Sequence, residues 1–176
     1  MKKLLSVLLI FALALSISAC GTDKQTSDKK DVNNTSNAET FASNENAQLF
    51  FDEVIENKKH IDPLFSLVCG TWKAEESKSG ATVSDVNKAI KGALSQHSST
   101  VTMIDEADQN IAELYELAKK CPASANVEAV MTAYKAYKIS VLKADASTNP
   151  GGYKDASAAK ASLDKALRNL RSTLSQ

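Results

Sequence analysis

The sequence contains few of the residues from which catalytic and metal sites are usually built. It has only two histidines and three cysteines in 176 residues. Neither histidine is close in sequence to a cysteine or to a pair of carboxylates, so no metal-ligand spacing is present. A glycine-rich phosphate loop and the Gly-x-Ser-x-Gly nucleophile elbow are also missing. These absences predict a protein with no catalytic residues, no metal and no cofactor.

The chain also lacks an excess of charge of either sign. It carries 21 basic and 21 acidic side chains, so no global field attracts nucleic acid, which we do not expect as a partner. The charges are nevertheless unevenly placed: residues 43–121 carry 8 basic and 13 acidic side chains, and residues 122–176 carry 8 and 4. We favour packing of the two halves against each other; the alternative is a partner that recognises one charged face.

One long hydrophobic run is present, and it lies at the N-terminus. Lys2 and Lys3 precede an apolar core at residues 4–19, and the run ends Ile17-Ser18-Ala19-Cys20. A core of 16 residues is short for a membrane-spanning helix, and this order of features is typical of a secretory signal peptide. A cysteine directly after the small residues looks like a bacterial lipobox. We therefore expect a signal peptide at residues 1–19, a diacylglyceryl group on Cys20, and a lipid-anchored protein on the extracytoplasmic side of the cell membrane.

Residues 20–46 are predicted to be a flexible polar linker that follows the lipidated cysteine. After Cys20, Val32 and Phe41 are its only large apolar residues. A segment this polar cannot bury enough surface to offset the entropy of ordering it. The folded domain is therefore expected at residues 47–176.

Apolar residues in that domain recur at spacings of three and four, which predicts amphipathic helices. Helices are expected at about residues 46–77, 84–120, 127–144 and 153–174. The first contains Pro63 and is expected to kink there, with a clean break as the alternative. The second has capping-box spacing between Thr82 and Asp85, and its helix-poor residues 95–100 make a break plausible. No useful stretch alternates with period two, so the fold class is all-α: an up-and-down bundle of about four helices, one or two of them kinked or broken.

The polar residues in these helices have ordinary explanations. His60 lies off the first apolar stripe and is expected to be solvated. His97 lies on the second stripe, where a partly buried, hydrogen-bonded histidine or a residue at the helix break is the simplest interpretation. Asp108 shares that stripe but lies about 16 Å from His97 along a continuous helix, so the two cannot form one site.

Cys69 and Cys121 are the cysteines that remain after Cys20 is lipidated. Two cysteines on the oxidising side of a membrane suggest a disulfide. In a hairpin with an unbroken second helix they would be roughly 40 Å apart, whereas a disulfide needs Cα atoms within about 7 Å. We therefore predict the bond together with a break at residues 95–100, at which the chain folds back along the first helix.

Several short motifs between residues 64 and 174 can be compared with a known group of proteins. They are Trp72, Asp85-Val86-Asn87-Lys88-Ala89, Leu114 to Ala118 ahead of Pro122, the pair Tyr134 and Tyr137, and Asn149-Pro150-Gly151-Gly152-Tyr153. With the lipobox, this pattern resembles small, uncharacterised helical lipoproteins of Gram-positive bacteria, in which serine often stands at the position of Gly152. The resemblance implies a helical domain held at the cell surface and supplies no active site.

Three classes of function are compatible with these features. The leading hypothesis is a non-catalytic binding or interaction module that is anchored through Cys20 and contacts a protein at the cell surface. The alternative is a carrier that holds a small apolar ligand between its helices, for which the aromatic residues of the stripes would line a pocket. An enzyme is the third class and the one we do not expect.

Overall fold

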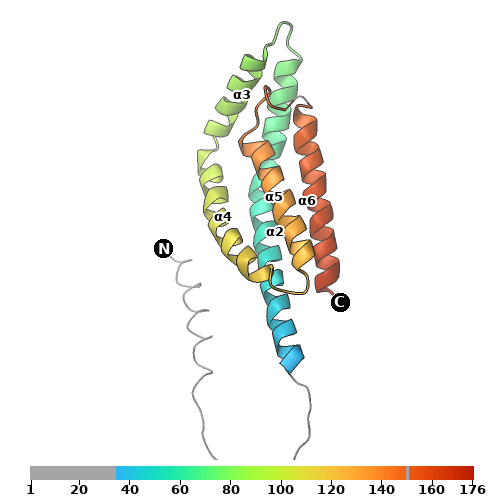
Figure 1. Ribbon diagram of the computed structural model, residues 1–176. Helices are drawn as coiled ribbons and strands as arrows, with labels where there is room; N and C mark the ends of the chain where they lie inside the picture. The colour runs from blue at the N-terminus through green and yellow to red at the C-terminus, as the bar shows by residue number, and fades with distance from the viewer. Residues whose placement is uncertain (1–34, 150) are drawn as a thin grey trace, which may run out of the picture. The chain divides into compact units, whose positions relative to one another are not determined.

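Five helices account for the secondary structure of the computed structural model, which describes residues 35–149 and 151–176, with side chains from residue 45 onward. The helices are α2 (Thr35–Glu76), α3 (Val83–Ser95), α4 (Ser98–Ala118), α5 (Ser124–Leu142) and α6 (Tyr153–Leu174) (Figure 1). No residue in these ranges forms a strand, so the all-α prediction is confirmed for this part of the chain. The predicted signal peptide and Cys20 lie outside the described residues.

The long helix α2 lies at the centre of a helical bundle and contacts each of the other four helices. Helices α3 and α4 follow one another along one flank of α2, and α5 and α6 lie side by side toward the other flank (Figure 1). None of the described helices is both long enough and apolar enough to cross a membrane.

Helix α2 is continuous through Pro63, so the alternative of a clean break is excluded. A proline inside a helix cannot donate to the carbonyl four residues earlier, here that of Lys59. The helix begins at Thr35, within the stretch predicted to be linker. A helix that is already nucleated by tertiary packing extends at little cost, because each further residue adds one hydrogen bond.

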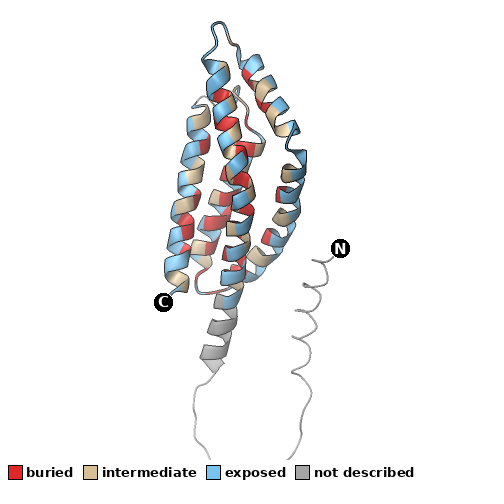
Figure 2. Cartoon of the chain, turned by 180° about the vertical axis from the view of Figure 1, so that it is seen from behind, coloured by how far each residue is buried: buried red, intermediate tan, exposed pale blue. Residues whose placement is uncertain are grey.

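The buried side chains of the described residues form one core between the helices (Figure 2). The stripes predicted for the four helical segments supply most of it. Its largest fully buried members are Tyr134, Tyr137, Phe50, Ile61, Leu64, Ile90, Ile104, Ile111, Leu163, Leu170, Val54 and Val68. Phe50, Ile61 and Leu64 lie on one face of α2, the face that the other helices cover.

The second predicted helical segment is two helices. The capping box at the start of α3 is confirmed: Thr82 and Asp85 each accept a hydrogen bond from the other's backbone N–H, at 3.3 Å and 3.0 Å. The predicted break is also confirmed, because α3 ends at Ser95 and α4 begins at Ser98. Serine side chains favour such breaks by bonding to nearby backbone, as Ser95 does with the carbonyl of Gly92 at 2.8 Å.

The chain does not fold back at this break, and that prediction is wrong. Helix α4 continues in the direction of α3 toward the N-terminal half of α2 (Figure 1). Asn57 of α2 donates a hydrogen bond to the carbonyl of Ile104, and the rings of Phe50 and Tyr115 lie 6.0 Å apart between centroids. Later residues of α4 therefore contact earlier residues of α2, as expected for a bent helix rather than a hairpin.

Gly152 ends the predicted turn between α5 and α6. Its amide donates to the carbonyl of Asn149 at 2.8 Å, and its φ of 61° and ψ of −138° lie in a region that essentially only glycine occupies. A Cβ built on Gly152 would also lie 3.3 Å from Nε1 of Trp72. The backbone conformation of this turn therefore explains the glycine at position 152.

We expect Gly152→Ala to lower the free energy of unfolding by about 1–3 kcal/mol, because alanine is strained at this φ and ψ. Urea unfolding followed by circular dichroism measures the change. Gly92→Ala is the matched control, since Gly92 lies inside α3 with nothing within 4 Å of a built Cβ. It should stabilise by roughly 0.5–1 kcal/mol. Equal effects of the two variants would contradict the assignment of strain to Gly152.

Candidate functional site

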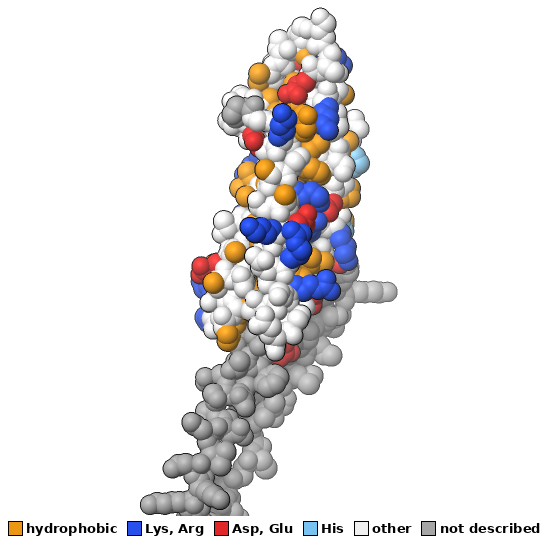
Figure 3. Space-filling model, turned by 90° about the vertical axis from the view of Figure 1, so that its right-hand side faces the viewer, with side chains coloured by type: hydrophobic (Ala, Val, Ile, Leu, Met, Phe, Trp, Pro, Cys, Tyr) orange, Lys and Arg blue, Asp and Glu red, His pale blue; other side chains and the backbone are white. Residues whose placement is uncertain are grey.

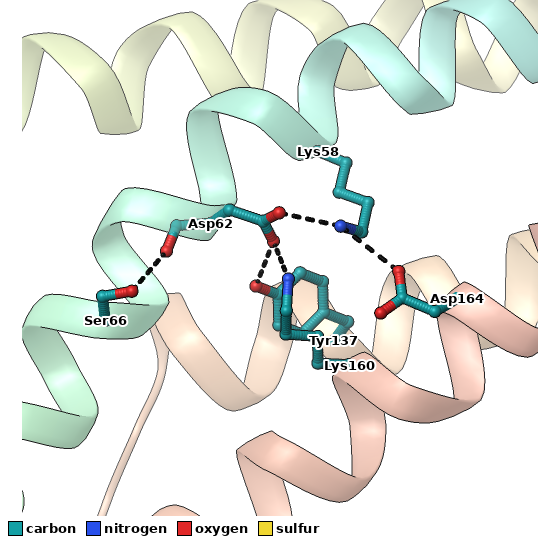
Figure 4. A network of polar contacts seen from close by, with 6 residues as sticks. All are labelled: Lys58, Asp62, Ser66, Tyr137, Lys160 and Asp164. Atoms are coloured by element: carbon teal, nitrogen blue, oxygen red, sulfur yellow. Dashed lines mark hydrogen bonds and ion pairs between the residues drawn. The ribbon is translucent and has the colours of Figure 1, made fainter.

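One group of interacting polar side chains surrounds Asp62 of α2, next to Pro63. Oδ2 of Asp62 accepts a hydrogen bond from Lys58 at 2.7 Å. Its Oδ1 accepts from the hydroxyl of Tyr137 at 2.8 Å and from Lys160 at 2.5 Å (Figure 4). Lys58 also pairs with Asp164 at 3.2 Å. We call these five residues the Asp62 network; it joins α2, α5 and α6.

The hydrogen bonds of the network determine its protonation. Burial alone would raise the pKa of Asp62, but the bonds from Lys160, Lys58 and Tyr137 outweigh it and hold this pKa below its ordinary value. Burial also raises the pKa of Tyr137, and the bond to Asp62 raises it further. Asp62 is therefore a carboxylate and Tyr137 a neutral phenol at neutral pH.

This arrangement is poorly suited to acid–base chemistry. A general base needs a pKa near the working pH and free access to a proton of the substrate. The pKa of Asp62 is instead lowered, and both of its oxygens are already engaged by donors. The network is best explained as a polar link between three helices, with two ammonium groups balanced by two carboxylates.

A second polar group joins α2, α4 and α5. Asn57 is 1% exposed and donates to the hydroxyl of Tyr134 at 2.7 Å and to the carbonyl of Ile104 at 3.2 Å. Tyr134 in turn donates to Asp108, which also pairs with Lys138. Oδ1 of Asn57 is buried and accepts no hydrogen bond from the described residues. Asp108, predicted only as a polar residue on an apolar stripe, therefore has two specific partners.

Ion pairs in both groups connect the acidic and basic halves of the chain. Lys138 of α5 pairs with Asp108 of α4, and Lys160 of α6 pairs with Asp62 of α2. Both pairs cross from residues 122–176, which are mainly basic, to residues 43–121, which are mainly acidic. Part of the charge asymmetry is therefore used within the fold, as the favoured interpretation of the sequence predicts.

The two histidines line the same surface groove, a relation that the sequence analysis missed. His60 of α2 and His97 at the helix break face a hollow of about 400 Å³. Its other lining residues are Lys59, Pro63, Leu64, Leu67 and Thr100. His97 is exposed and directly precedes α4, so it is a residue of the helix break rather than a buried histidine. Among the described residues, no three of the His, Cys, Asp and Glu type are grouped so that they could hold a metal ion.

Cys69 and Cys121 are separate, buried thiols, and the predicted disulfide is not formed. Cys69 lies in the C-terminal half of α2, with its thiol 3.9 Å from the carbonyl of Tyr153. Cys121 follows α4, beyond the residues that face the N-terminal half of α2. Because the chain does not fold back at residues 95–100, the two cysteines lie at opposite ends of the bundle, and no rotation of their side chains can join them.

Mass spectrometry of the non-reduced protein should therefore find both residues as free thiols. Alkylation should be slow in the native state because both side chains are buried and because burial raises the pKa of Cys69. It should be fast in denaturant. A mass two hydrogens lower, with both residues protected in denaturant, would contradict this arrangement.

The comparisons with known proteins add no family to these observations. No family model matches the chain, and no curated protein or solved structure matches it either.

Asp62→Asn should lower the free energy of unfolding at pH 7 by about 1–2 kcal/mol. This loss is smaller than for a fully buried carboxylate, because the side chain of Asp62 is 35% exposed and solvent screens its charge. The folded pKa of Asp62 is lowered, so its contribution is present above the unfolded pKa of about 3.9 and is lost as the pH falls through the folded value. The difference between wild type and variant should therefore close in acid. Urea unfolding between pH 7 and pH 2 measures it.

Glu113→Gln is the control for this experiment, because Glu113 is an exposed acid of α4. It should leave the stability of the protein at pH 7 nearly unchanged. A difference between wild type and Asp62→Asn that stays constant in acid would show that the carboxylate charge is not what stabilises the network.

Proposed function

We propose that this protein is a lipid-anchored, extracytoplasmic lipoprotein whose up-and-down helical bundle acts as a non-catalytic binding module. The observation that carries the proposal is the sequence Ile17-Ser18-Ala19-Cys20 at the end of a charged and then apolar N-terminus. Residues 34–176 form a compact unit of their own, as expected of a folded domain.

The interior of the bundle supports binding through the surface rather than storage of a ligand. A carrier needs an apolar cavity among the helices. The aromatic positions that would line such a cavity hold Phe50, Tyr134 and Tyr137, which are fully buried in the core. The hydroxyls of the two tyrosines are also engaged, in the Asp62 network and with Asn57. A small apolar ligand would have to displace these contacts.

The surface offers apolar side chains that a protein partner could contact. Leu49, Val83, Met103, Leu117 and Ile139 are the exposed large apolar residues, each between 44% and 51% accessible. Helix α4, which carries Met103 and Leu117, has five acidic and no basic side chains. We propose that a protein at the cell surface recognises faces of this kind.

Replacement of the lipidated residue tests the anchor. With Cys20→Ser, the precursor should not be lipidated, and the protein should move from the membrane fraction of the cells to the medium. The reason is that two acyl chains hold a protein stably at a bilayer, whereas the described helices contain no span to replace them. Fractionation with immunoblotting, and the intact mass of the purified protein, measure the change.

Cys121→Ser is the matched control, because it removes a thiol of the helical unit and leaves the lipobox intact. It should remain in the membrane fraction with a lipid on its first residue. Unchanged membrane association and processing of Cys20→Ser would rule out the anchor.

Crosslinking of the wild-type protein on intact cells, followed by capture, is the experiment that would identify a protein partner.

A further inference from the structure

A small pocket lies between α2 and α6, next to the Asp62 network. Its volume is about 200 Å³. Apolar side chains and charged side chains line it together: Phe51, Ile55 and Leu167, with Lys58, Asp164, Arg168 and Arg171. We call it the α2–α6 pocket. Such a lining suits a ligand that is anionic at one end and apolar at the other.

The charges of the pocket leave two guanidinium groups available. Lys58 and Asp164 neutralise each other at 3.2 Å. Arg168 and Arg171 form no ion pair with any of the described residues, and they are three residues apart on α6, so they share one face of the helix. Arginine binds phosphate with two parallel hydrogen bonds, which an ammonium group cannot do.

The surrounding surface is also basic. Figure 3 shows Lys and Arg side chains distributed along this side of the bundle. Helix α6 carries Lys154, Lys160, Lys165, Arg168 and Arg171 against two acids, Asp155 and Asp164. The whole protein is near neutral, so this surface attracts anions only at short range.

We propose that the α2–α6 pocket binds the phosphate headgroup of an anionic phospholipid and rests the bundle on the bilayer to which Cys20 is anchored. Arg168 and Arg171 bind the phosphate, and the lipid's apolar part next to the headgroup contacts Phe51 and Leu167. The inference rests on the proposed lipid anchor, which keeps the pocket close to headgroups. An anchored domain needs little intrinsic affinity, because tethering raises the effective concentration of its ligand.

The position of the pocket in the chain agrees with this proposal. Phe51 and Ile55 belong to the N-terminal half of α2, the half that the chain enters from the predicted anchor. Arg168 and Arg171 belong to the C-terminal part of α6, which ends at the same end of the bundle (Figure 1). The basic surface is thus at the end of the bundle nearest to the anchor along the chain.

Vesicle flotation tests the pocket without the anchor. The protein is the mature chain from residue 20 with Cys20→Ser, which keeps the entire compact unit of residues 34–176. The probes are vesicles of phosphatidylcholine with phosphatidylglycerol and vesicles of phosphatidylcholine alone. We expect binding to the anionic vesicles only, and release at high salt. The double variant Arg168→Gln with Arg171→Gln should lower the partition coefficient of the protein between anionic vesicles and water about thirtyfold. Each cation near the surface of an anionic membrane contributes about 1 kcal/mol, or about a fivefold change in this coefficient.

Lys135→Gln with Lys143→Gln is the matched control, because it removes the same charge from an exposed residue of α5 and from the exposed residue that follows this helix. It should change the partition coefficient much less, and circular dichroism should show that both double variants are folded. Equal losses in the two double variants would overturn the pocket in favour of a general charge effect. Absence of binding to anionic vesicles, or equal binding to neutral ones, would overturn the proposal as well.

Inorganic phosphate tests whether the two arginines recognise a phosphate group. At constant ionic strength, phosphate should release the protein from anionic vesicles more effectively than chloride, because it competes with the lipid phosphate for the same guanidinium groups. Equal release by the two anions would overturn phosphate recognition in the pocket. Thermal stabilisation of the protein by phosphate without any binding to anionic vesicles would mean that the ligand is free phosphate, and would overturn docking to lipid. The outcome is independent of the anchor, since the tested chain has none. Failure of the anchor in cells would leave flotation unchanged, and failure of the pocket would leave Cys20 lipidated.

Discussion

The fold depends on the burial of one long apolar stripe of α2. Phe50, Val54, Ile61 and Val68 lie along this stripe and are at most 1% exposed, which requires neighbours along most of the length of the helix. Helices α3 and α4 cover one flank and α5 and α6 the other (Figure 1). Each fully buried side chain of this size contributes about 1.5–3 kcal/mol relative to exposure, so the apolar contacts of α2 outweigh any single polar interaction in the molecule.

Polar groups then specify how the neighbours are arranged around α2. Asp62 accepts bonds from α5 and α6, and Asn57 donates to α4 and α5. Apolar packing tolerates small sliding of one helix along another, whereas a buried donor left unpaired costs about 1–3 kcal/mol. Asp62 precedes Pro63, where the helix has already lost one backbone hydrogen bond. The two polar groups therefore fix the relative positions of the helices at the middle of α2.

Local features of the sequence predicted the helices well, because periodicity, capping and breaking act within a few residues. The buried stripe of α5, the capping box of Thr82 and the break before Ser98 are of this kind. Long-range pairing was not predictable in the same way. Nothing near Lys58 in the sequence indicates its ion pair with Asp164 of α6. The predicted reversal of the chain after the break was also wrong. Helix-poor residues allow a bend or a reversal equally, and only the packing of α4 along α2 decides between them.

The polar groups inside the bundle determine which side chains are left for contacts at its surface. The carboxylates of Asp62 and Asp108 form ion pairs between helices of the bundle. The surface presents apolar side chains on α4, cations on α6 and a shallow groove at the helix break. Surface contacts of this kind are individually weak, and from free solution the near-neutral charge would give them no long-range assistance. Under the proposed function, a lipid on Cys20 would change that balance, because it would confine the domain near the bilayer, where a weak contact suffices.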